Sequence, residues 1–251
     1  MLLIGFPAQA FATNCYVLAA ERGSECVVVD PGIGVMDPLE AIFAEYSLRP
    51  AAVLLTHGHL DHTFSVAPVC GAQGIPAYLH PDYDTMLADP MSGLSKQSQQ
   101  MFGDRLEWTE PDDVMPLVDG ARLELVGLSI TVHHAPGHTR GSVMFGIEAV
   151  GQVVSVAGSA SGQLPDPLAP GCLTGDVLFA GSIGRVDLPG GSGRAMMASL
   201  ASQVLPMADR TVVLPGHGPS STIAVERATN PYLQQAANMA AAGMNLPRKG
   251  L

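Results

Sequence analysis

The chain has 251 residues, enough for one large domain with a substantial buried core. Its hydrophobic content of 47%, with 28 glycines and 20 prolines, indicates many short apolar strands joined by tight turns rather than a helical bundle or a disordered chain. The formal net charge of −11 argues against a nucleic-acid partner, because binding to phosphates usually needs clustered Lys and Arg.

Cysteine usage and the N-terminal residues indicate a cytoplasmic protein. The four cysteines show neither CxxC spacing nor a dense framework, which is typical of reduced thiols. Residues 8–10 resemble a signal-peptidase site, but no basic residue precedes them, and Gly5 and Pro7 interrupt the apolar stretch. No apolar run reaches the length of a membrane span, so we expect no membrane partner. The sequence does not indicate an oligomeric state.

The first part of the chain predicts strands with one long helix between them. Apolar runs at 14–19 and 26–29 predict a hairpin that ends at Asp30, and helical spacing of apolar residues predicts a helix at 38–48. A continuous apolar run predicts a buried strand at 51–55. A helix at 63–70 and a short strand at 77–79 are expected to follow.

The remainder predicts a second set of strands followed by helices. Residues 82–116 are mixed in composition and predict a cap over the site, with helical pieces near 83–87 and 95–102. Strands are expected at 121–125, 129–133, 142–147, 172–174 and 211–214. The Gly-, Ser- and Pro-rich stretch at 149–171 predicts a mobile loop within the same single domain, 1–251. Helices are expected at 194–205 and 222–242, the second broken at Asn230–Pro231. Two such halves suit two sheets with helices outside.

A dense group of ligand-type side chains directly follows the predicted strand at 51–55. His57, His59, Asp61 and His62 stand within six residues. Imidazole and carboxylate groups suit zinc, iron or manganese, and residues two apart on an extended segment point the same way. A loop of solvated histidines is a poor alternative. Such a loop would explain one or two of these residues, but not four ligand-type residues within six positions. The pattern therefore predicts a metal site at this strand end.

Three later strands end in a glycine followed by one ligand-type residue. Glycine permits a sharp turn and a close approach of the backbone, which lets side chains from separate strands converge. Taken singly, a Gly-His pair is more often an ordinary loop histidine, but together with the first group these residues favour a shared metal site. They are Gly137–His138, Gly175–Asp176 and Gly216–His217.

These motifs in this order, with Gly-His-Thr-x-Gly-Ser at 137–142, resemble the metallo-β-lactamase superfamily over about Phe11 to Asn230. The resemblance implies an α+β fold, a four-layer αββα sandwich with two mixed sheets and helices on the outer faces. It also implies two divalent metal ions, zinc foremost, with iron or manganese as alternatives. Asp30 matches a residue that supports the metal ligands in the family.

The resemblance further implies a role for each ligand-type residue. One ion would be held by His57, His59 and His138, and the other by Asp61, His62 and His217, with Asp176 as the bridge. Asp61, His62 and Asp176 would also be the catalytic residues. Two ions held 3.5–4 Å apart lower the pKa of a bound water from about 15.7 toward about 7, which produces a hydroxide at neutral pH.

The stretch at 175–191 resembles glyoxalase II-like (hydroxyacylglutathione hydrolase-like) thioester hydrolases. This implies hydrolysis of an acyl thioester of the 2-hydroxyacyl-thiol class by a metal-bound hydroxide, with a small-molecule thioester as partner. Arg185 is a candidate contact for a substrate carboxylate, the alternative being an ion pair within the loop. Standard glyoxalase II carries a longer C-terminal helical domain that helps to hold glutathione, whereas 34 residues follow His217 here, so a different thiol is an alternative.

The sequence leaves other functions open. A persulfide dioxygenase with a single iron shares the fold and most motifs, but its Cys-Gly-Arg-Thr-Asp pattern reads Ile-Gly-Arg-Val-Asp at 183–187, which favours hydrolysis. A lactone or β-lactam hydrolase is a further alternative. A non-enzymatic metal-sensing module is least expected, because all seven ligand-type residues are present. We interpret His80, His133 and His134 as structural.

Overall fold

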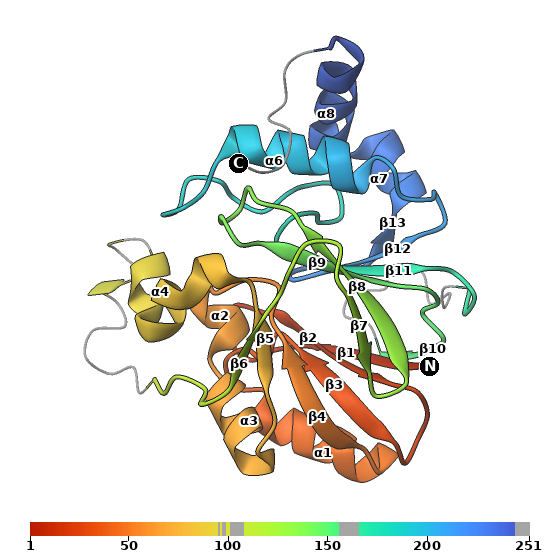
Figure 1. Ribbon diagram of the computed structural model, residues 1–251. Coiled ribbons are helices and arrows are strands. Elements are labelled where there is room, and N and C mark those ends of the chain that lie inside the picture. Colours follow the sequence, from red (N-terminus) through yellow and green to blue (C-terminus); the bar gives the residue numbers. More distant parts are fainter. Residues whose placement is uncertain (95, 97–98, 101–107, 156–165, 244–251) are drawn as a thin grey trace.

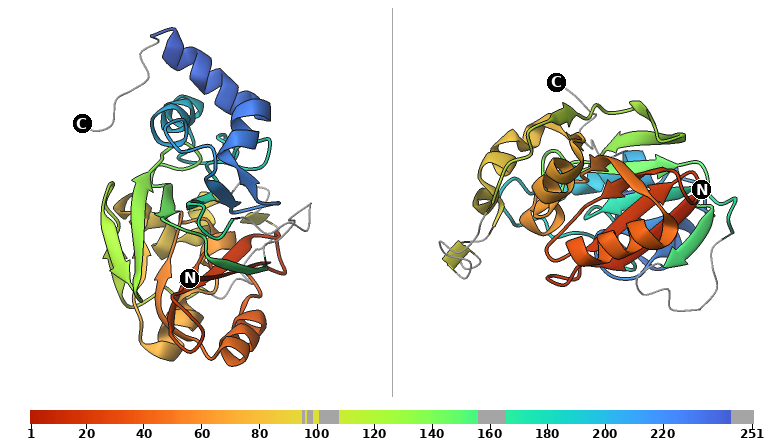
Figure 2. Two further views of the ribbon diagram at one scale, coloured as in Figure 1. Left: turned by 90° about the vertical axis from the view of Figure 1, so that its right-hand side faces the viewer. Right: turned by 90° about the horizontal axis from the view of Figure 1, so that it is seen from below.

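Two β-sheets packed face to face form the centre of the protein in the computed structural model, which describes residues 1–94, 96, 99–100, 108–155 and 166–243. Helices cover the outer face of each sheet, so the layers run helix, sheet, sheet, helix (Figure 1). Figure 2 shows the same layers from two further directions. The expected αββα sandwich with two mixed sheets is thereby confirmed.

The first sheet has seven strands in the order β10-β1-β2-β3-β4-β5-β6. Strands β1 to β3 pair antiparallel, whereas β3 to β6 run parallel and β10 runs parallel to β1. The bounds are β1 (Leu2–Pro7), β2 (Asn14–Ala19), β3 (Glu25–Val29), β4 (Arg49–Leu54), β5 (Ala77–Leu79), β6 (Val114–Pro116) and β10 (Gln152–Ser155).

The second sheet has six strands in the order β13-β12-β11-β9-β8-β7. Strands β11 and β12 are parallel, and the other neighbours are antiparallel. The bounds are β7 (Arg122–Leu125), β8 (Leu128–His134), β9 (Val143–Ile147), β11 (Gly171–Gly175), β12 (Val212–Pro215) and β13 (Ser221–Thr222).

The helices fall into three sets. Helices α1 (Met36–Tyr46) and α3 (Val66–Gln73) cover the first sheet, and α6 (Gly193–Ser199), α7 (Ile223–Thr229) and α8 (Pro231–Ala241) cover the second. The third set consists of short helices in the chain between β4 and β6: α2 (Leu60–Thr63), η1 (Pro81–Tyr83), α4 (Asp84–Ala88) and η2 (Pro90–Gly93). Helix α6 continues into a π-helical turn at Leu200–Val204. The break expected at Asn230 is confirmed, because its side chain accepts hydrogen bonds from the backbone N–H groups of Tyr232 and Leu233.

The central strands are buried on both faces, which explains their continuous apolar runs. Alternate residues of β2 point to opposite sides: Leu18 packs between the sheets with Phe145 of β9, whereas Val17 packs toward α1. A third apolar cluster joins the outer face of the second sheet to α6 and α8, with Met196 and Leu233 among its fully buried members.

Several boundaries differ from the expectations. Strand β1 was not predicted, and the stretches expected as cap (82–116) and loop (149–171) each contribute one strand to the first sheet, β6 and β10. The helix expected at 63–70 is two helices, α2 and α3, of which α2 begins within the metal motif. Parts of the expected cap (95, 97–98, 101–107) and loop (156–165) lie outside the described residues.

Candidate active site

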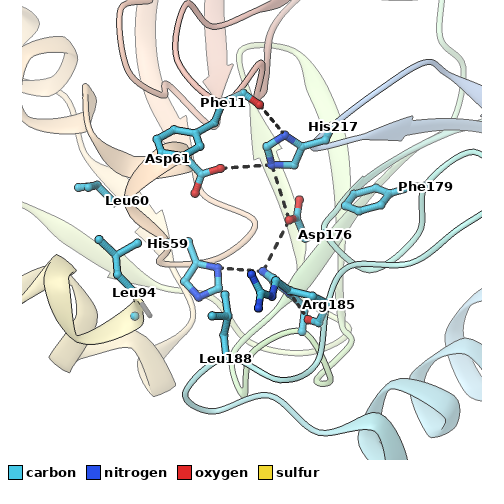
Figure 3. Close-up of a pocket in the computed structure, with 12 residues that line it drawn as sticks. Phe11, His59, Leu60, Asp61, Leu94, Asp176, Phe179, Arg185, Leu188 and His217 are labelled. Atoms are coloured by element: carbon cyan, nitrogen blue, oxygen red, sulfur yellow. Dashed lines mark hydrogen bonds and ion pairs between the residues drawn. The ribbon is translucent and has the colours of Figure 1, made fainter. Parts of the chain in front are cut away.

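All seven ligand-type residues lie together at one end of the two sheets. His57 and His59 follow β4, and Asp61 and His62 lie in α2. The others follow strands of the second sheet: His138 after β8, Asp176 after β11 and His217 after β12. Figure 3 shows His59, Asp61, Asp176 and His217 around one cavity. The structure thus brings together every residue that the sequence assigned to the metal site.

Three histidine nitrogens converge in what we call the His59 group, made of His57, His59 and His138. The Nδ1 atom of His59 lies 2.8 Å from Nε2 of His138 and 3.1 Å from Nε2 of His57. All three side chains are buried. Three nitrogen lone pairs that point at one small volume repel one another, whereas a cation in that volume would bind all three.

Two histidines and a carboxylate form the His217 group, made of Asp61, His62 and His217. The Nε2 atom of His217 lies 3.2 Å from Oδ2 of Asp61 and 3.3 Å from Nε2 of His62. His62 is fully buried, whereas Asp61 and His217 face the cavity. The site therefore has one closed side and one open side.

Asp176 lies between the two groups. Its Oδ2 atom is 3.6 Å from Nε2 of His138 and 3.7 Å from Nε2 of His217. Its Oδ1 atom is buried and accepts no hydrogen bond among the described residues, although Nε2 of His62 lies 3.4 Å away. A buried carboxylate oxygen without a partner is costly, and a cation would satisfy it.

Outward hydrogen bonds orient four of the five histidine rings. In each case Nδ1 has a partner behind the ring, so that Nε2 points into the site, as metal-binding histidines commonly do. These contacts join His57 to Thr56 Oγ1 (3.1 Å), His62 to Asp30 Oδ2 (2.9 Å), His138 to the Arg185 carbonyl (2.7 Å) and His217 to the Phe11 carbonyl (3.2 Å).

His59 is oriented differently. Its Nδ1 atom faces the site, and its buried Nε2 atom has no hydrogen-bond partner among the described residues. The ring is held instead by packing, since a Cβ atom added at Gly93 of η2 would lie 2.9 Å from Cδ2 of His59. The cap segment therefore contacts a ligand-type residue directly.

Three supporting residues were not found from the sequence. The hydroxyl of Thr13 donates to Oδ2 of Asp61 at 2.9 Å, Thr56 contacts both Asp30 and His57, and Phe11 offers its carbonyl to His217. No motif marks these positions. The β1–β2 connection reaches the site because the backbone of Thr13 pairs with that of His217.

Two of the glycines are required by close contacts. Gly175 has a left-handed backbone with φ of 47°, and a Cβ atom there would lie 2.5 Å from Oγ1 of Thr56. A Cβ atom at Gly216 would lie 2.3 Å from Oδ1 of Asp176 and 2.7 Å from Cε1 of His62. A side chain at Gly216 would displace ligand-type groups, and one at Gly175 would displace Thr56, which contacts His57.

Burial and neighbouring charges set the protonation of the site. Burial and the nearby histidines lower the pKa of His57 and lower that of His59 to about 3. Burial alone would lower the pKa of His62, but the carboxylates of Asp61, Asp176 and Asp30 raise it well above the ordinary value. Burial would raise the pKa of Asp61 and Asp176, yet the histidines, His62 foremost, lower both. Neutral imidazoles and ionised carboxylates are the forms that bind metals.

The family model of the metallo-beta-lactamase superfamily matches residues 8–151. The chain belongs to this superfamily. An uncharacterized protein of Mycobacterium leprae is 45% identical over 93% of this chain and 99% of its own length. The hydroxyacylglutathione hydrolase GloC of Haemophilus influenzae is 30% identical over 90% of this chain and 95% of its own.

Solved structures agree with this assignment. The B3 metallo-beta-lactamase BLEG-1 is 33% identical, with a TM-score of 0.75 over 92% of this chain and 99% of that one. TTHA1623, solved in a di-iron-bound form, is 35% identical, with a TM-score of 0.66 over 91% of this chain and 98% of that one. The chain is thus a metallo-hydrolase superfamily member with a cluster suited to two metal ions.

A cavity of about 400 Å³ opens beside the His/Asp cluster of this superfamily member. Among the described residues, the side chains that line it are mostly the ligand-type groups and large apolar residues. They are Phe11, His59, Leu60, Asp61, Gly93, Leu94, His138, Asp176, Phe179, Arg185, Leu188 and His217. Its size is within the range of small-molecule sites.

Arg185 lines this cavity, and its guanidinium group is engaged by Asp187. The Nε and Nη2 atoms of Arg185 donate to Oδ1 and Oδ2 of Asp187, both at 2.8 Å. The ion pair named above as the alternative is therefore present. Contact between Arg185 and a substrate carboxylate stays a prediction.

His80 and His134 stack on each other outside this cavity, with ring centroids 4.2 Å apart and an interplanar angle of 8°. Their ligand atoms and that of Asp82 lie within 4.8 Å of one another. A metal ion must lie near the plane of each imidazole that binds it, and two stacked parallel rings cannot both meet that condition. His134 also contacts the Arg140 carbonyl through Nε2 at 2.9 Å. This geometry favours the structural interpretation of the pair.

The described residues contain no helix with the length and apolar character needed to span a bilayer.

Proposed function

We propose that the protein hydrolyses an acyl thioester of the 2-hydroxyacyl-thiol class with the help of two divalent metal ions, zinc foremost, with iron or manganese as alternatives. The convergence of seven ligand-type groups beside a cavity of small-molecule size carries the proposal. The similarity to GloC supports a thioester as substrate. The di-iron form of TTHA1623 supports a two-metal site without deciding the metal here.

The residues fit such a pair of ions. The inward-facing nitrogens and the unpartnered Oδ1 atom of Asp176 are the donors that the ions would satisfy. Asp176 would serve both ions, because it lies between the two groups. The His59 group would hold one ion and the His217 group the other.

When bound, two such ions polarise the substrate carbonyl and lower the pKa of a water molecule toward about 7. The chain's own groups favour water as the nucleophile, because no Ser, Thr, Cys or Lys occurs among the described lining residues. The four cysteines are buried, and burial raises the pKa of the Cys26, Cys70 and Cys172 thiols to about 12.

Asp61, His62 and Asp176 are the proposed catalytic residues. The carboxylates of Asp61 and Asp176 line the cavity and stay ionised at neutral pH, so they can accept hydrogen bonds from an attacking water. His62 holds Nε2 toward both of them from the buried side. The apolar walls exclude bulk water and strengthen these interactions.

The test is a thioester assay on metal-analysed protein. We would follow cleavage of S-lactoylglutathione and of the lactoyl thioester of N-acetylcysteamine, together with oxygen uptake on glutathione persulfide. Cleavage of either thioester with about two metals per chain, abolished in His57→Ala and Asp176→Asn, is the expected result. Oxygen uptake with a single iron and no thioester cleavage would replace the proposal with a persulfide dioxygenase.

Hydrolysis of a β-lactam or a lactone is the second candidate. The similarity to the lactamase BLEG-1 favours a β-lactam specifically, and the same cluster could serve either ring. Nitrocefin and a simple lactone in the same assay separate the two. If a ring substrate is turned over with a higher kcat/KM than both thioesters, the protein is a β-lactam or lactone hydrolase instead.

We also propose that the protein works in the cytoplasm on a small molecule. All four cysteines are free thiols in the structure. Reduced cysteines are typical of a reducing compartment.

A further inference from the structure

The cavity offers very little for a charged substrate apart from the ligand-type groups. Excluding those, every described lining residue except one is apolar or glycine: Phe11, Leu60, Gly93, Leu94, Phe179 and Leu188. The exception is Arg185. Removing a carboxylate from water into such surroundings is unfavourable unless a cation meets it. Arg185 is therefore the one cationic side chain among the described lining residues that could recognise an anionic thiol half.

The guanidinium group of Arg185 is already paired with the carboxylate of Asp187. Asp187 receives two parallel hydrogen bonds from Arg185, each 2.8 Å long, which is the geometry in which a guanidinium group binds a carboxylate most strongly. Asp187 is two residues away on the same loop, so its effective concentration at Arg185 is high. The Arg185 hydrogen bond lowers the pKa of Asp187 to about 2, which keeps the pair charged at neutral pH.

A carboxylate on the substrate would have to displace Asp187 before it could bind Arg185. Both members of the pair are more than half exposed, so displacement is feasible, but the substrate must compete with an internal carboxylate of the same chemistry. A thiol half without carboxylates faces no such competition and gains contact with the apolar walls.

We propose that this site selects thioesters whose thiol half carries no carboxylate, and that Asp187 sets this preference as a positioning residue by holding Arg185. The inference rests on the proposed thioester hydrolysis and names the class of substrate for it.

A matched pair of substrates tests the preference. S-lactoylglutathione and its dimethyl ester share one acyl group and one thiol skeleton, and differ in two carboxylates. We expect wild-type kcat/KM to be about tenfold or more in favour of the dimethyl ester.

Substitution of Asp187 tests the cause. In Asp187→Asn the guanidinium of Arg185 becomes available, so KM for S-lactoylglutathione should fall about fivefold with kcat unchanged, while the dimethyl ester should be unaffected. The double variant Arg185→Gln, Asp187→Asn should lose that gain. Asp209→Asn is the matched control, because Asp209 pairs with Arg227 at 2.9 Å on the surface and neither residue lines the cavity.

The outcomes are distinct. A wild-type preference for S-lactoylglutathione over its dimethyl ester overturns the inference and leaves the thioester hydrolase intact. An equal change for both substrates in Asp187→Asn, or the same change in Asp209→Asn, shows a general charge effect and also overturns it. Absence of cleavage of both thioesters by the metal-loaded wild type removes the proposed function and the inference with it.

Discussion

The carboxylate of Asp30 holds the imidazole of His62 from behind, with Oδ2 lying 2.9 Å from Nδ1. Both side chains are buried, and Asp30 also accepts hydrogen bonds from the backbone N–H and the hydroxyl of Thr56 at 2.8 and 2.6 Å. The Asp30 carboxylate accepts a hydrogen bond from Nδ1 of His62, so Nδ1 keeps its proton, and Nε2 is the atom that would give up a proton and offer a lone pair when a metal ion binds. The residue that directly follows β3 thus orients a ligand-type histidine on α2.

The first prediction follows from this contact. In Asp30→Asn an amide N–H can donate to Nδ1 of His62, which moves the ring proton to Nε2 and blocks the lone pair. We expect metal affinity to fall about 10- to 100-fold, measured by competition with a chromophoric chelator. Asparagine tolerates the left-handed φ of 50° at this position, so the fold should be retained. An unchanged affinity would contradict the assigned tautomer.

The second prediction concerns Thr13, whose hydroxyl donates to Asp61 at 2.9 Å. Thr13→Val keeps the buried shape and removes the donor, so Asp61 loses a charge-assisted hydrogen bond. Metal bound by the His217 group should weaken by about tenfold in the same competition assay. Thr13→Ser keeps the hydroxyl and should behave like the wild type. Equal weakening in both variants would indicate a packing effect instead.

Local sequence patterns predicted the inner strands of the first sheet. The strands at its edges form through pairing with strands that are distant in sequence or short, which local patterns do not reveal. Strands β2, β3 and β4 carry apolar runs that are visible in sequence because both their faces are buried. Strand β10 has four residues and exists through parallel pairing with β1, about 150 residues earlier in the chain. Such pairing leaves no local signal in composition. Strand β6, at the other edge, likewise depends on pairing with β5.

The ligand-type residues were predictable for a different reason. His57, His59, Asp61 and His62 are close in sequence, and the other three repeat one strand–glycine–ligand pattern. The residues that orient them show no such pattern. Phe11 contributes a backbone carbonyl, which any residue could offer, and Thr13 acts through a single hydroxyl at the start of a strand. Their roles follow from the tertiary position of the β1–β2 connection.

The third prediction is the pH dependence of stability in metal-stripped protein. His57, His59 and His138 have pKa values lowered by burial, that of His59 to about 3, so below pH 6.5 the unfolded chain takes up protons that the folded chain does not. His62 and His217 have raised pKa values, so below pH 6.5 they are protonated in both the folded and the unfolded chain. They therefore do not change the pH dependence of the free energy of unfolding in that range. The free energy of unfolding should therefore fall between pH 6.5 and 5, by up to about 1.4 kcal/mol per pH unit for each buried histidine.

Urea unfolding in the presence of a chelator at pH 7.0, 6.0 and 5.0 measures this slope. His59→Asn removes one of the three groups, and should make the dependence shallower. A stability that stays constant over this range would contradict the burial of neutral histidines in the metal-free site.

The last prediction uses the close approach of Gly216, which directly follows β12, to two ligand-type residues. In Gly216→Ala the added Cβ atom would lie 2.3 Å from Oδ1 of Asp176 and 2.7 Å from Cε1 of His62, so one of these groups must move. We expect a loss of most bound metal, measured by elemental analysis after dialysis, together with a loss of turnover. Gly71→Ala is the control: Gly71 lies in α3, and a Cβ atom there would have no neighbour within 4 Å. This control should keep its metal and gain up to about 1 kcal/mol in stability, because alanine favours a helix over glycine. If Gly216→Ala bound metal as the wild type does, the contacts of Gly216 with Asp176 and His62 would not matter for metal binding, and the prediction would be wrong.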